Sequence, residues 1–285
     1  MNYPTSFDSI STWASENGLS VQEARFRFAQ YAVLHGVADS RALSASLVFK
    51  GGNALDFIWE PNRSTKDLDF SATPEELQMQ DLKRLLEESL HRVGTITSVA
   101  FRVQHMERRP PGPDKTFAAY LSNIGYALPD EYKNRERIQR GEGVSTVVPI
   151  DVSLNEPICA TAPIDIEGTH SLQVCTLEDI VAEKLRALLQ QIPRKRWRCQ
   201  DVLDIAVILT RQHKLDSAQV ASYLVRKARA RNIEVSKKAF RDEEVRSRAS
   251  VNYADLEATT RRKFIPFDAA YSMLVGFVDG LQIPE

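Results

Sequence analysis

The chain has 285 residues, of which 43% are hydrophobic and 26% are charged, and its formal net charge is −1. This composition is typical of a globular protein with a hydrophobic core and excludes the intrinsically disordered class. No apolar run approaches the roughly 18 residues that a membrane span requires, and residues 1–18 have neither the basic start nor the apolar core of a signal peptide. We therefore expect a cytoplasmic protein with no membrane partner.

Charge is distributed unevenly along the chain. Residues 184–263 contain 20 Lys or Arg against 9 Asp or Glu, a balance of +11, and the remainder has a balance of −12. The net charge argues against nucleic-acid binding by the whole surface, but the basic segment is compatible with an RNA partner.

The N-terminal part of the chain is predicted to form helices followed by a strand. Apolar residues recur with the helical period over residues 21–34, and Gly36 is expected to end this helix. A second short helix, at about 39–46, precedes an apolar strand that ends at Phe49.

Two helices and a strand are expected next. Residues 53–59 are expected to form a short helix with Asn53 as its N-cap. A loop then leads into a strand at residues 67–70. The sequence Thr-Pro-Glu-Glu at 73–76 is a typical helix start, with a cap, a first-position proline and an acidic third residue, and this helix is expected to run to about Val93.

Strand-like runs dominate the following segment, at residues 98–104, 116–128 and 144–154. Because they follow alternating helices and strands, we predict an α/β fold with a mixed β-sheet.

The C-terminal part is expected to be mainly α-helical. Thr176 caps a predicted helix at residues 177–191, and a further helix starts at 201–210. Helical patterns continue from Ser217 onward, interrupted by the polar stretch 234–250.

Five residues in the predicted sheet region are candidates for a functional site. The pair Gly51 and Gly52 directly follows the first strand, and Asp67 and Asp69 are spaced so that both project from one face of a strand. Two adjacent carboxylates repel each other unless a cation lies between them, which indicates a divalent metal site. Asp151 is a lone carboxylate inside a later strand that is otherwise suited to burial, so it too needs a partner.

This order of features is typical of phosphoryl transfer to a hydroxyl. Such chemistry needs metal ions held by carboxylates of adjacent strands, and a glycine pair lets backbone N–H groups approach the phosphates. Each feature has a simpler interpretation when taken alone: a plain turn, a solvated edge strand, or a core carboxylate paired with an arginine. Their joint order favours the phosphoryl-transfer interpretation and resembles the pattern of the nucleotidyltransferase superfamily.

A closer resemblance is to the AbiEii-type nucleotidyltransferase toxins of abortive-infection and type IV toxin–antitoxin systems. It is carried by KGGNAL at 50–55, RSTKDLDF at 63–70, EKLR at 183–186 and QDVLDI at 200–205. Two positions depart from the family pattern. Asn53 stands where the family more often has Thr or Ser, and Gln200 replaces a Lys, which leaves the last acidic residue open between Asp201 and Asp204.

The resemblance implies a nucleotidyltransferase-like mixed β-sheet domain at 1–160 and a mainly α-helical domain at 161–285 that closes the nucleotide cleft. It implies an enzyme that uses Mg²⁺ (or Mn²⁺) to transfer a nucleotide from an NTP to an acceptor hydroxyl, for some members the 3′ end of tRNA, and releases pyrophosphate. It also implies toxin activity and a cognate antitoxin protein. The implied catalytic residues are Asp67, Asp69, Asp151, Lys184 and Asp201, with the metal on Asp67, Asp69 and Asp151. The implied nucleotide-binding residues are Lys50, Gly51, Gly52, Asn53, Arg63 and Lys184.

Two of the basic features have alternatives. Lys184 could belong to a surface charge pattern on its helix, and the resemblance favours a contact with the triphosphate or the acceptor. The basic loop, which we define as Arg194, Lys195, Arg196, Trp197 and Arg198, suits RNA backbone contact and base stacking. It could equally be a solvated loop with Trp197 in the core. For the protein as a whole, the alternatives are a small-molecule nucleotidyltransferase that modifies an antibiotic or metabolite, and a catalytically silent binding module.

Overall fold

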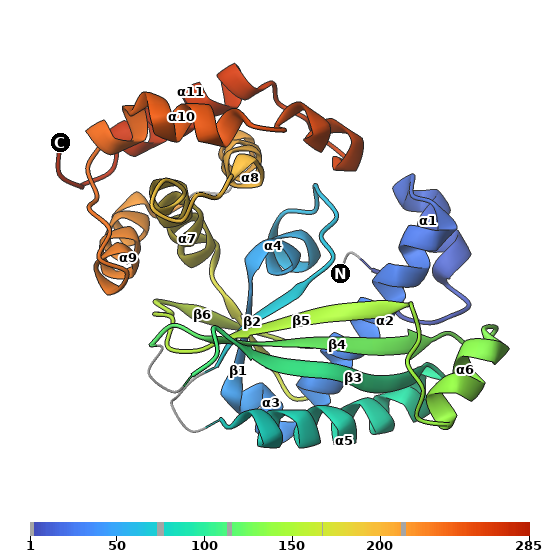
Figure 1. Cartoon of the computed structure of the whole chain (residues 1–285). Coiled ribbons are helices and arrows are strands. Elements are labelled where there is room, and N and C mark those ends of the chain that lie inside the picture. The colour runs from blue at the N-terminus through green and yellow to red at the C-terminus, as the bar shows by residue number, and fades with distance from the viewer. Residues whose placement is uncertain (1–2, 73–76, 113–115, 167, 212–214) are drawn as a thin grey trace. The chain divides into compact units, whose positions relative to one another are not determined.

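The computed structural model describes residues 3–72, 77–112, 116–166, 168–211 and 215–285 (Figure 1). The chain folds into two compact units, each assembled from several segments. Unit 1 contains Met1–Ile58, Thr65–Asn155 and Ala162–Val174, and unit 2 contains Trp59–Ser64, Glu156–Thr161 and Cys175–Glu285. No helix in the described part of the chain has both the length and the apolar character that crossing a membrane requires.

A mixed sheet forms the frame of unit 1. Within the described residues its seven strands lie in the order β3-β4-β5-β2-β1-β7-β6 (Figure 1). Their bounds are β1 Leu47–Lys50, β2 Leu68–Ala72, β3 Ala100–Arg109, β4 Ala119–Ala127, β5 Val147–Ser153, β6 Thr161–Ile164 and β7 Leu172–Cys175. Strand β1 is antiparallel to β2 and parallel to β7, and β2 is parallel to β5. The predicted α/β class with a mixed sheet is confirmed.

Alternation of side chains explains how the central strands are buried. In β2, Leu68 and Phe70 are 0% and 1% exposed, whereas Asp69 between them is only partly buried. The Phe70 ring lies 5.3 Å, centroid to centroid, from the ring of Phe49 on β1. Because side chains alternate between the two faces of a strand, the residues that fix β2 in the core also direct Asp69 away from Phe70.

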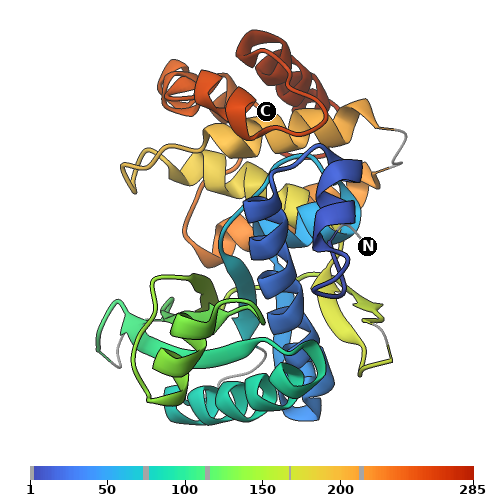
Figure 2. The ribbon, with the colours of Figure 1, turned by 90° about the vertical axis from the view of Figure 1, so that its right-hand side faces the viewer.

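Helices α2 and α5 pack against each other in unit 1 (Figure 2). The prediction that Gly36 ends the first of them is wrong, since α2 continues through it. A Cβ at Gly36 would lie 3.1 Å from Cγ1 of Val93 on α5, so the glycine permits close helix packing instead of a helix end. The helices of unit 1 are α1 Ile10–Asn17, α2 Val21–Asp39, α3 Arg41–Ser46, α4 Gly51–Ala54, α5 Met79–Thr97 and α6 Tyr132–Gln139, with a π-helical turn η1 at Leu55–Trp59.

The starts of α4 and α5 differ from their predictions. Lys50, and not Asn53, is the N-cap residue of α4, which places Asn53 inside the helix. Helix α5 begins at Met79 after Gln78, later than predicted, and the predicted start at residues 73–76 lies outside the described residues. Helix α6 and strands β6 and β7 were not predicted at all.

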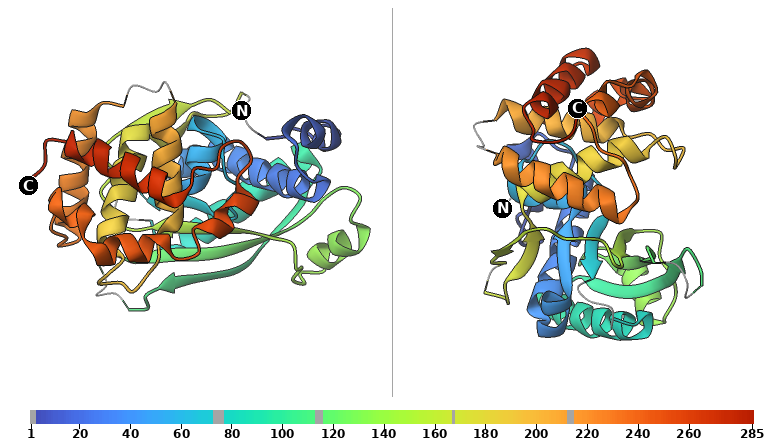
Figure 3. Two further views of the ribbon diagram at one scale, coloured as in Figure 1. Left: turned by 90° about the horizontal axis from the view of Figure 1, so that it is seen from above. Right: turned by 90° about the vertical axis from the view of Figure 1, so that its left-hand side faces the viewer.

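Helices dominate the described part of unit 2 (Figure 3). Helix α7 packs on α9, and α8 packs on α11. Thr176 caps α7 as predicted, accepting a 3.3 Å hydrogen bond from the backbone N–H of Asp179. The stretch 234–250 was predicted to be non-helical, but it contains η2 and α10. The bounds are α7 Leu177–Gln190, α8 Cys199–Thr210, α9 Ser217–Ala230, α10 Glu243–Ser250 and α11 Phe267–Asp279, with 3-10 turns η2 Lys238–Arg241 and η3 Ala254–Thr259.

Candidate functional site

Three carboxylates of unit 1 lie on or next to strands β2 and β5, and we call them the acidic cluster: Asp67, Asp69 and Asp151. Asp69 and Asp151 are direct partners in the parallel β2–β5 register. Neighbouring strands lie about 4.8 Å apart and paired residues project to the same face, so the two carboxyl groups are neighbours. Asp67 lies one residue before β2 and is exposed, while Asp69 and Asp151 are partly buried.

Charges around Asp151 act on it in opposite directions. Burial, and secondarily the negative charge of Asp67, raise the pKa of Asp151, while the nearby positive charge of Lys50 opposes the rise. Lys50 is paired with Asp69 in the β1–β2 register, and its Nζ donates a 3.0 Å hydrogen bond to Oγ of Ser153. The cation that acts on Asp151 is therefore a strand lysine, and not the core arginine of the alternative interpretation.

The backbone conformation and the neighbouring acidic cluster together require a glycine at position 51. Its φ is +76°, a left-handed conformation that side-chain-bearing residues rarely adopt. A Cβ at this position would also collide with the carboxylate of Asp69. Only glycine meets both conditions, so the turn between β1 and α4 keeps the backbone open directly beside Asp69.

The acidic cluster has the ligand chemistry of a divalent cation site. Carboxylate oxygens are the hard ligands that Mg²⁺ and Mn²⁺ take, and the glycine turn leaves room beside one of them. Among the described residues, however, no group of three or more His, Cys, Asp or Glu side chains is already gathered as a metal cage. The donor set fits a magnesium-type ion, whose remaining ligands would have to come from substrate and water.

Asn53 is turned into the interior of unit 1. Its side chain is 0% exposed, and Oδ1 accepts a 3.0 Å hydrogen bond from Nη1 of Arg27. Nδ2 donates to the backbone oxygens of Asp67, at 2.6 Å, and of Thr65, at 3.3 Å. Sequence analysis missed Arg27 and its neighbour Gln30, although polar residues within the helical apolar pattern of residues 21–34 were a usable signal.

Unit 2 contains a buried ionic cluster of Arg63, Lys184, Asp201 and Asp204. Nζ of Lys184 donates to Oδ1 of Asp201 at 2.9 Å and to Oδ2 of Asp204 at 2.7 Å. Nη2 of Arg63 lies 3.2 Å from Oδ2 of Asp204. Lys184 is only 8% exposed, so the interpretation of Lys184 as part of a surface charge pattern is wrong.

The pKa values in the ionic cluster reflect its pairing. Burial by itself would raise the pKa of Asp204, but Arg63 and Lys184 outweigh it and lower this pKa to about 2. Burial would likewise lower the pKa of Lys184, but the two aspartates raise it. At neutral pH Asp204 is therefore ionised and Lys184 is protonated, so their charges compensate each other.

The two aspartates of the ionic cluster differ in how fully they are bound. Both carboxylate oxygens of Asp204 accept hydrogen bonds from Arg63. In Asp201, Oδ2 is buried without a hydrogen-bond partner in the described structure, and Nη1 of Arg198 lies 3.9 Å from it. Asp201 thus retains a carboxylate oxygen that can still accept a hydrogen bond, whereas both oxygens of Asp204 already accept one.

The basic loop connects α7 to α8. Trp197 is 59% exposed, so the alternative in which its ring packs into the core is wrong. An exposed indole among arginine and lysine side chains offers a stacking surface next to positive charge.

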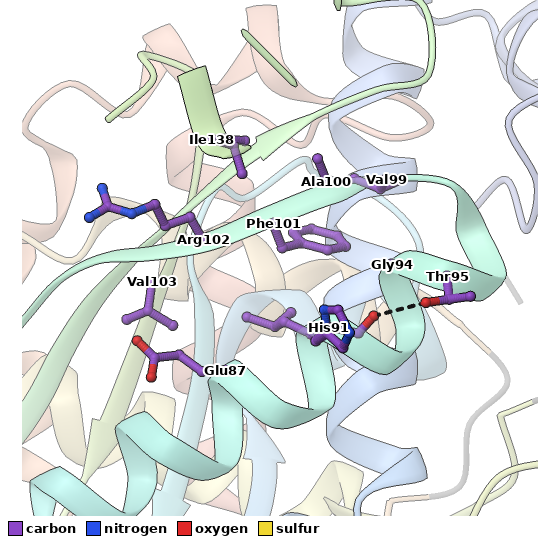
Figure 4. Close-up of a pocket in the computed structure, with 11 residues that line it drawn as sticks. Glu87, His91, Gly94, Thr95, Val99, Ala100, Phe101, Arg102, Val103 and Ile138 are labelled. Atoms are coloured by element: carbon purple, nitrogen blue, oxygen red, sulfur yellow. Dashed lines mark hydrogen bonds between the residues drawn. The ribbon is translucent and has the colours of Figure 1, made fainter. Parts of the chain in front are cut away.

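A cavity of about 420 Å³ lies in unit 1 between α5 and β3, apart from the acidic cluster (Figure 4). Leu90 and Phe101 line it together with the polar side chains of Glu87 and His91. None of the predicted site residues lines this cavity.

Three solved structures share the fold of this chain. A putative nucleotidyltransferase from Helicobacter pylori has a TM-score of 0.54 and 16% identity, covering 92% of this chain and 95% of that one. JHP933 from Helicobacter pylori has a TM-score of 0.55 and 16% identity, with 92% of each chain covered. MenT4, a nucleotidyltransferase toxin from Mycobacterium tuberculosis, has a TM-score of 0.53 and 17% identity, covering 92% of this chain and 85% of that one. The fold is that of nucleotidyltransferases.

The family follows from the sequence itself. The family described as "Nucleotidyl transferase AbiEii toxin, Type IV TA system" matches residues 33–273, and the chain belongs to this family. No curated protein matches this chain significantly. The predicted resemblance to AbiEii-type toxins is confirmed.

Proposed function

We propose that this protein is a Mg²⁺-dependent toxin that transfers a nucleotide from an NTP to a hydroxyl at the 3′ end of an RNA, with tRNA as the foremost acceptor, and thereby inhibits growth. The observation that carries the proposal is the register of β2 and β5, which pairs Asp69 with Asp151. Asp67 lies close enough to raise the pKa of Asp151, so all three carboxylates share one region of unit 1.

Each carboxylate of the acidic cluster has a role in the proposed reaction. Asp67 and Asp69 would hold Mg²⁺, or Mn²⁺ in its place, and Asp151 would complete this set. When bound, the ion supplies positive charge to the phosphate oxygens during in-line displacement at the α-phosphorus, which releases pyrophosphate. Asp151 would also accept the proton of the attacking hydroxyl, and its raised pKa makes it a stronger base than an ordinary aspartate.

The remaining site residues divide between the two units. In unit 1, Lys50, Gly51 and Gly52 would receive the triphosphate, because the glycine turn exposes backbone N–H groups beside a cation. In unit 2, we propose that Asp201 and not Asp204 takes part in transfer, since Oδ2 of Asp201 has no hydrogen-bond partner among the described residues.

Lys184 and Arg63 already donate hydrogen bonds within the ionic cluster, which limits the donors that they could offer to a phosphate. Lys184 has three N–H donors and uses two of them on Asp201 and Asp204, which leaves the third for a phosphate. Arg63 binds Asp204 through Nε and Nη2, so a phosphate would be bound by its remaining guanidinium donors or in competition with that carboxylate.

RNA is favoured over a small-molecule acceptor by the basic loop. Trp197 is exposed among four cations, and residues 184–263 carry a charge balance of +11. Stacking on an aromatic ring and contact with a phosphate backbone suit a polymer with unpaired bases. An NTP and RNA substrate also favour a cytoplasmic location, and the family favours a cognate antitoxin, which we expect to be encoded beside this chain.

The proposal is tested by incubating the purified protein with radiolabelled NTPs, Mg²⁺ and total RNA. We expect labelled tRNA with the wild type and none with Asp69→Asn, while Asp130→Asn, which removes an exposed carboxylate of unit 1, behaves as the wild type. Label on a small molecule instead of RNA would support the antibiotic or metabolite alternative. Absence of any label, with growth unaffected by expression, would support the silent binding module and overturn the proposal.

A further inference from the structure

Buried side chains hold the segment before β2 by its backbone oxygens. Nε2 of Gln30 donates to the oxygens of Thr65, at 3.1 Å, and Lys66, at 2.9 Å. Nδ2 of Asn53 donates to the oxygens of Thr65 and Asp67. Two amide groups therefore hold three consecutive peptide groups, and the last of these belongs to Asp67. We call Gln30 and Asn53 the amide clamp.

Arg27 braces the amide clamp from α2. Its Nη1 donates to Oδ1 of Asn53 at 3.0 Å and to Oε1 of Gln30 at 3.4 Å. Its guanidinium also pairs with Asp56 and lies 4.3 Å from the ring centroid of Phe57. Because Arg27 binds the amide oxygens, both amides must turn their NH₂ groups toward the 65–67 segment.

Burial restricts what Asn53 can bind. Arg27, Gln30 and Asn53 are 2%, 0% and 0% exposed. Both hydrogens of the Asn53 amide are committed to Thr65 and Asp67, and its oxygen is committed to Arg27. Asn53 therefore has no donor left for a phosphate in this arrangement.

We propose that Arg27, Gln30 and Asn53 are positioning residues that place Asp67 for metal binding beside Asp69 and Asp151. Asn53, predicted to bind the nucleotide, acts instead on a metal ligand through the backbone. This inference rests on the proposed function. Groups that orient metal ligands contribute to metal affinity, and their loss typically costs about 10- to 100-fold.

The test is Asn53→Asp, which keeps an acceptor for Arg27 but places a carboxylate oxygen against the carbonyls of Thr65 and Asp67. We expect Mn²⁺ binding, measured by electron paramagnetic resonance without nucleotide, to weaken about 10- to 100-fold. In transfer assays kcat should fall and the Mg²⁺ requirement should rise, with the KM for NTP unchanged within about twofold, since the triphosphate contacts remain. A raised KM with unchanged Mn²⁺ binding would overturn the proposal in favour of a phosphate contact.

Two further variants separate positioning from general stability. Gln30→Glu disturbs the carbonyls of Thr65 and Lys66 but not that of Asp67, so it should weaken Mn²⁺ binding less; it also carries the test if Asn53→Asp does not fold. Asn62→Asp is the matched control, because Asn62 is 3% exposed and bonds to the backbone of Lys263 in unit 2.

The control should lower the melting temperature and leave Mn²⁺ binding unchanged. If Asn53→Asp and Asn62→Asp both change only the melting temperature, the amide clamp is merely structural and the inference is wrong. If the wild type itself binds no Mn²⁺ and transfers no nucleotide, the proposed function fails first, and the inference fails with it.

Discussion

Asp151 of the acidic cluster is partly buried and Asp204 of the ionic cluster is buried, but their pKa values move in opposite directions. Burial and Asp67 raise the pKa of Asp151, and Lys50 opposes them. For Asp204 burial acts the same way, but Arg63 and Lys184 outweigh it and lower the pKa to about 2. The ionic cluster thus compensates its buried charges internally, whereas the acidic cluster gathers negative charge that a bound cation would relieve.

The largest effect we expect is on catalysis by Asp151→Asn. The amide cannot accept the proton of the hydroxyl or contribute a full negative charge, so the rate of pyrophosphate release should fall about 10³-fold. Without metal, the melting temperature should stay the same or rise slightly, because a raised pKa means that the ionised carboxylate costs the folded state free energy at neutral pH. A large loss of stability would show that Asp151 is compensated in the same way as Asp204.

Asp204→Asn should have the opposite profile. Removing one partner of a buried, hydrogen-bonded charge group leaves Lys184 and Arg63 undercompensated, which costs about 3–5 kcal/mol of unfolding free energy. Urea unfolding at neutral pH measures this. A change below about 1 kcal/mol would mean that the ionic cluster resembles a surface pair.

The ionic cluster also predicts how stability depends on pH. The pKa of Asp204 is lowered from 3.8 to about 2 on folding, so its contribution is complete above pH 3.8 and is lost as the pH falls toward 2. The shift corresponds to about 2 kcal/mol. Urea unfolding of the wild type and Asp204→Asn at pH 5, 3 and 2 should show the two converging at acid pH. Parallel curves would contradict the assignment.

The sequence predicted the acidic cluster better than the ionic one. Asp67 and Asp69 follow a two-residue period in a run with apolar neighbours, and the structure places Asp69 in β2 and Asp67 one residue before it. Lys184, Asp201 and Asp204 lie on two helices, and their pairing and burial depend on how α7 and α8 pack, which no local pattern encodes. The roles of all these residues in transfer stay predictions.

The fold predictions that failed also have physical explanations. Helix α6 buries no residue and so shows no apolar stripe, and β6 has no buried residue either. Gly36 looked like a helix end because glycine favours such positions, but contact with Val93 determines its role. Asn53 looked like an N-cap for a similar reason, and only the structure shows Arg27 and the 65–67 segment around it.

A smaller effect is expected for Trp197→Ala in the basic loop. The side chain is 59% exposed, so the melting temperature should hardly change, whereas loss of one stacked base should weaken binding of single-stranded RNA by about 1 kcal/mol, or five- to tenfold. Trp197→Phe should retain most of the affinity. Equal RNA binding by all three proteins, measured by fluorescence anisotropy at one fixed salt concentration, would remove the loop from the acceptor site.

The smallest effect is expected at an exposed ion pair of unit 1. Nη1 and Nη2 of Arg25 bind the two carboxylate oxygens of Asp130 at 2.8 and 2.6 Å, and this contact lowers the pKa of Asp130. The Asp130 side chain is nevertheless 50% exposed, so water already solvates it in the folded state. A double-mutant cycle of Arg25→Gln and Asp130→Asn should give a coupling below about 1 kcal/mol. If this coupling free energy were as large as the loss of unfolding free energy in Asp204→Asn, the strength of an ion pair would depend on its geometry and not on its burial.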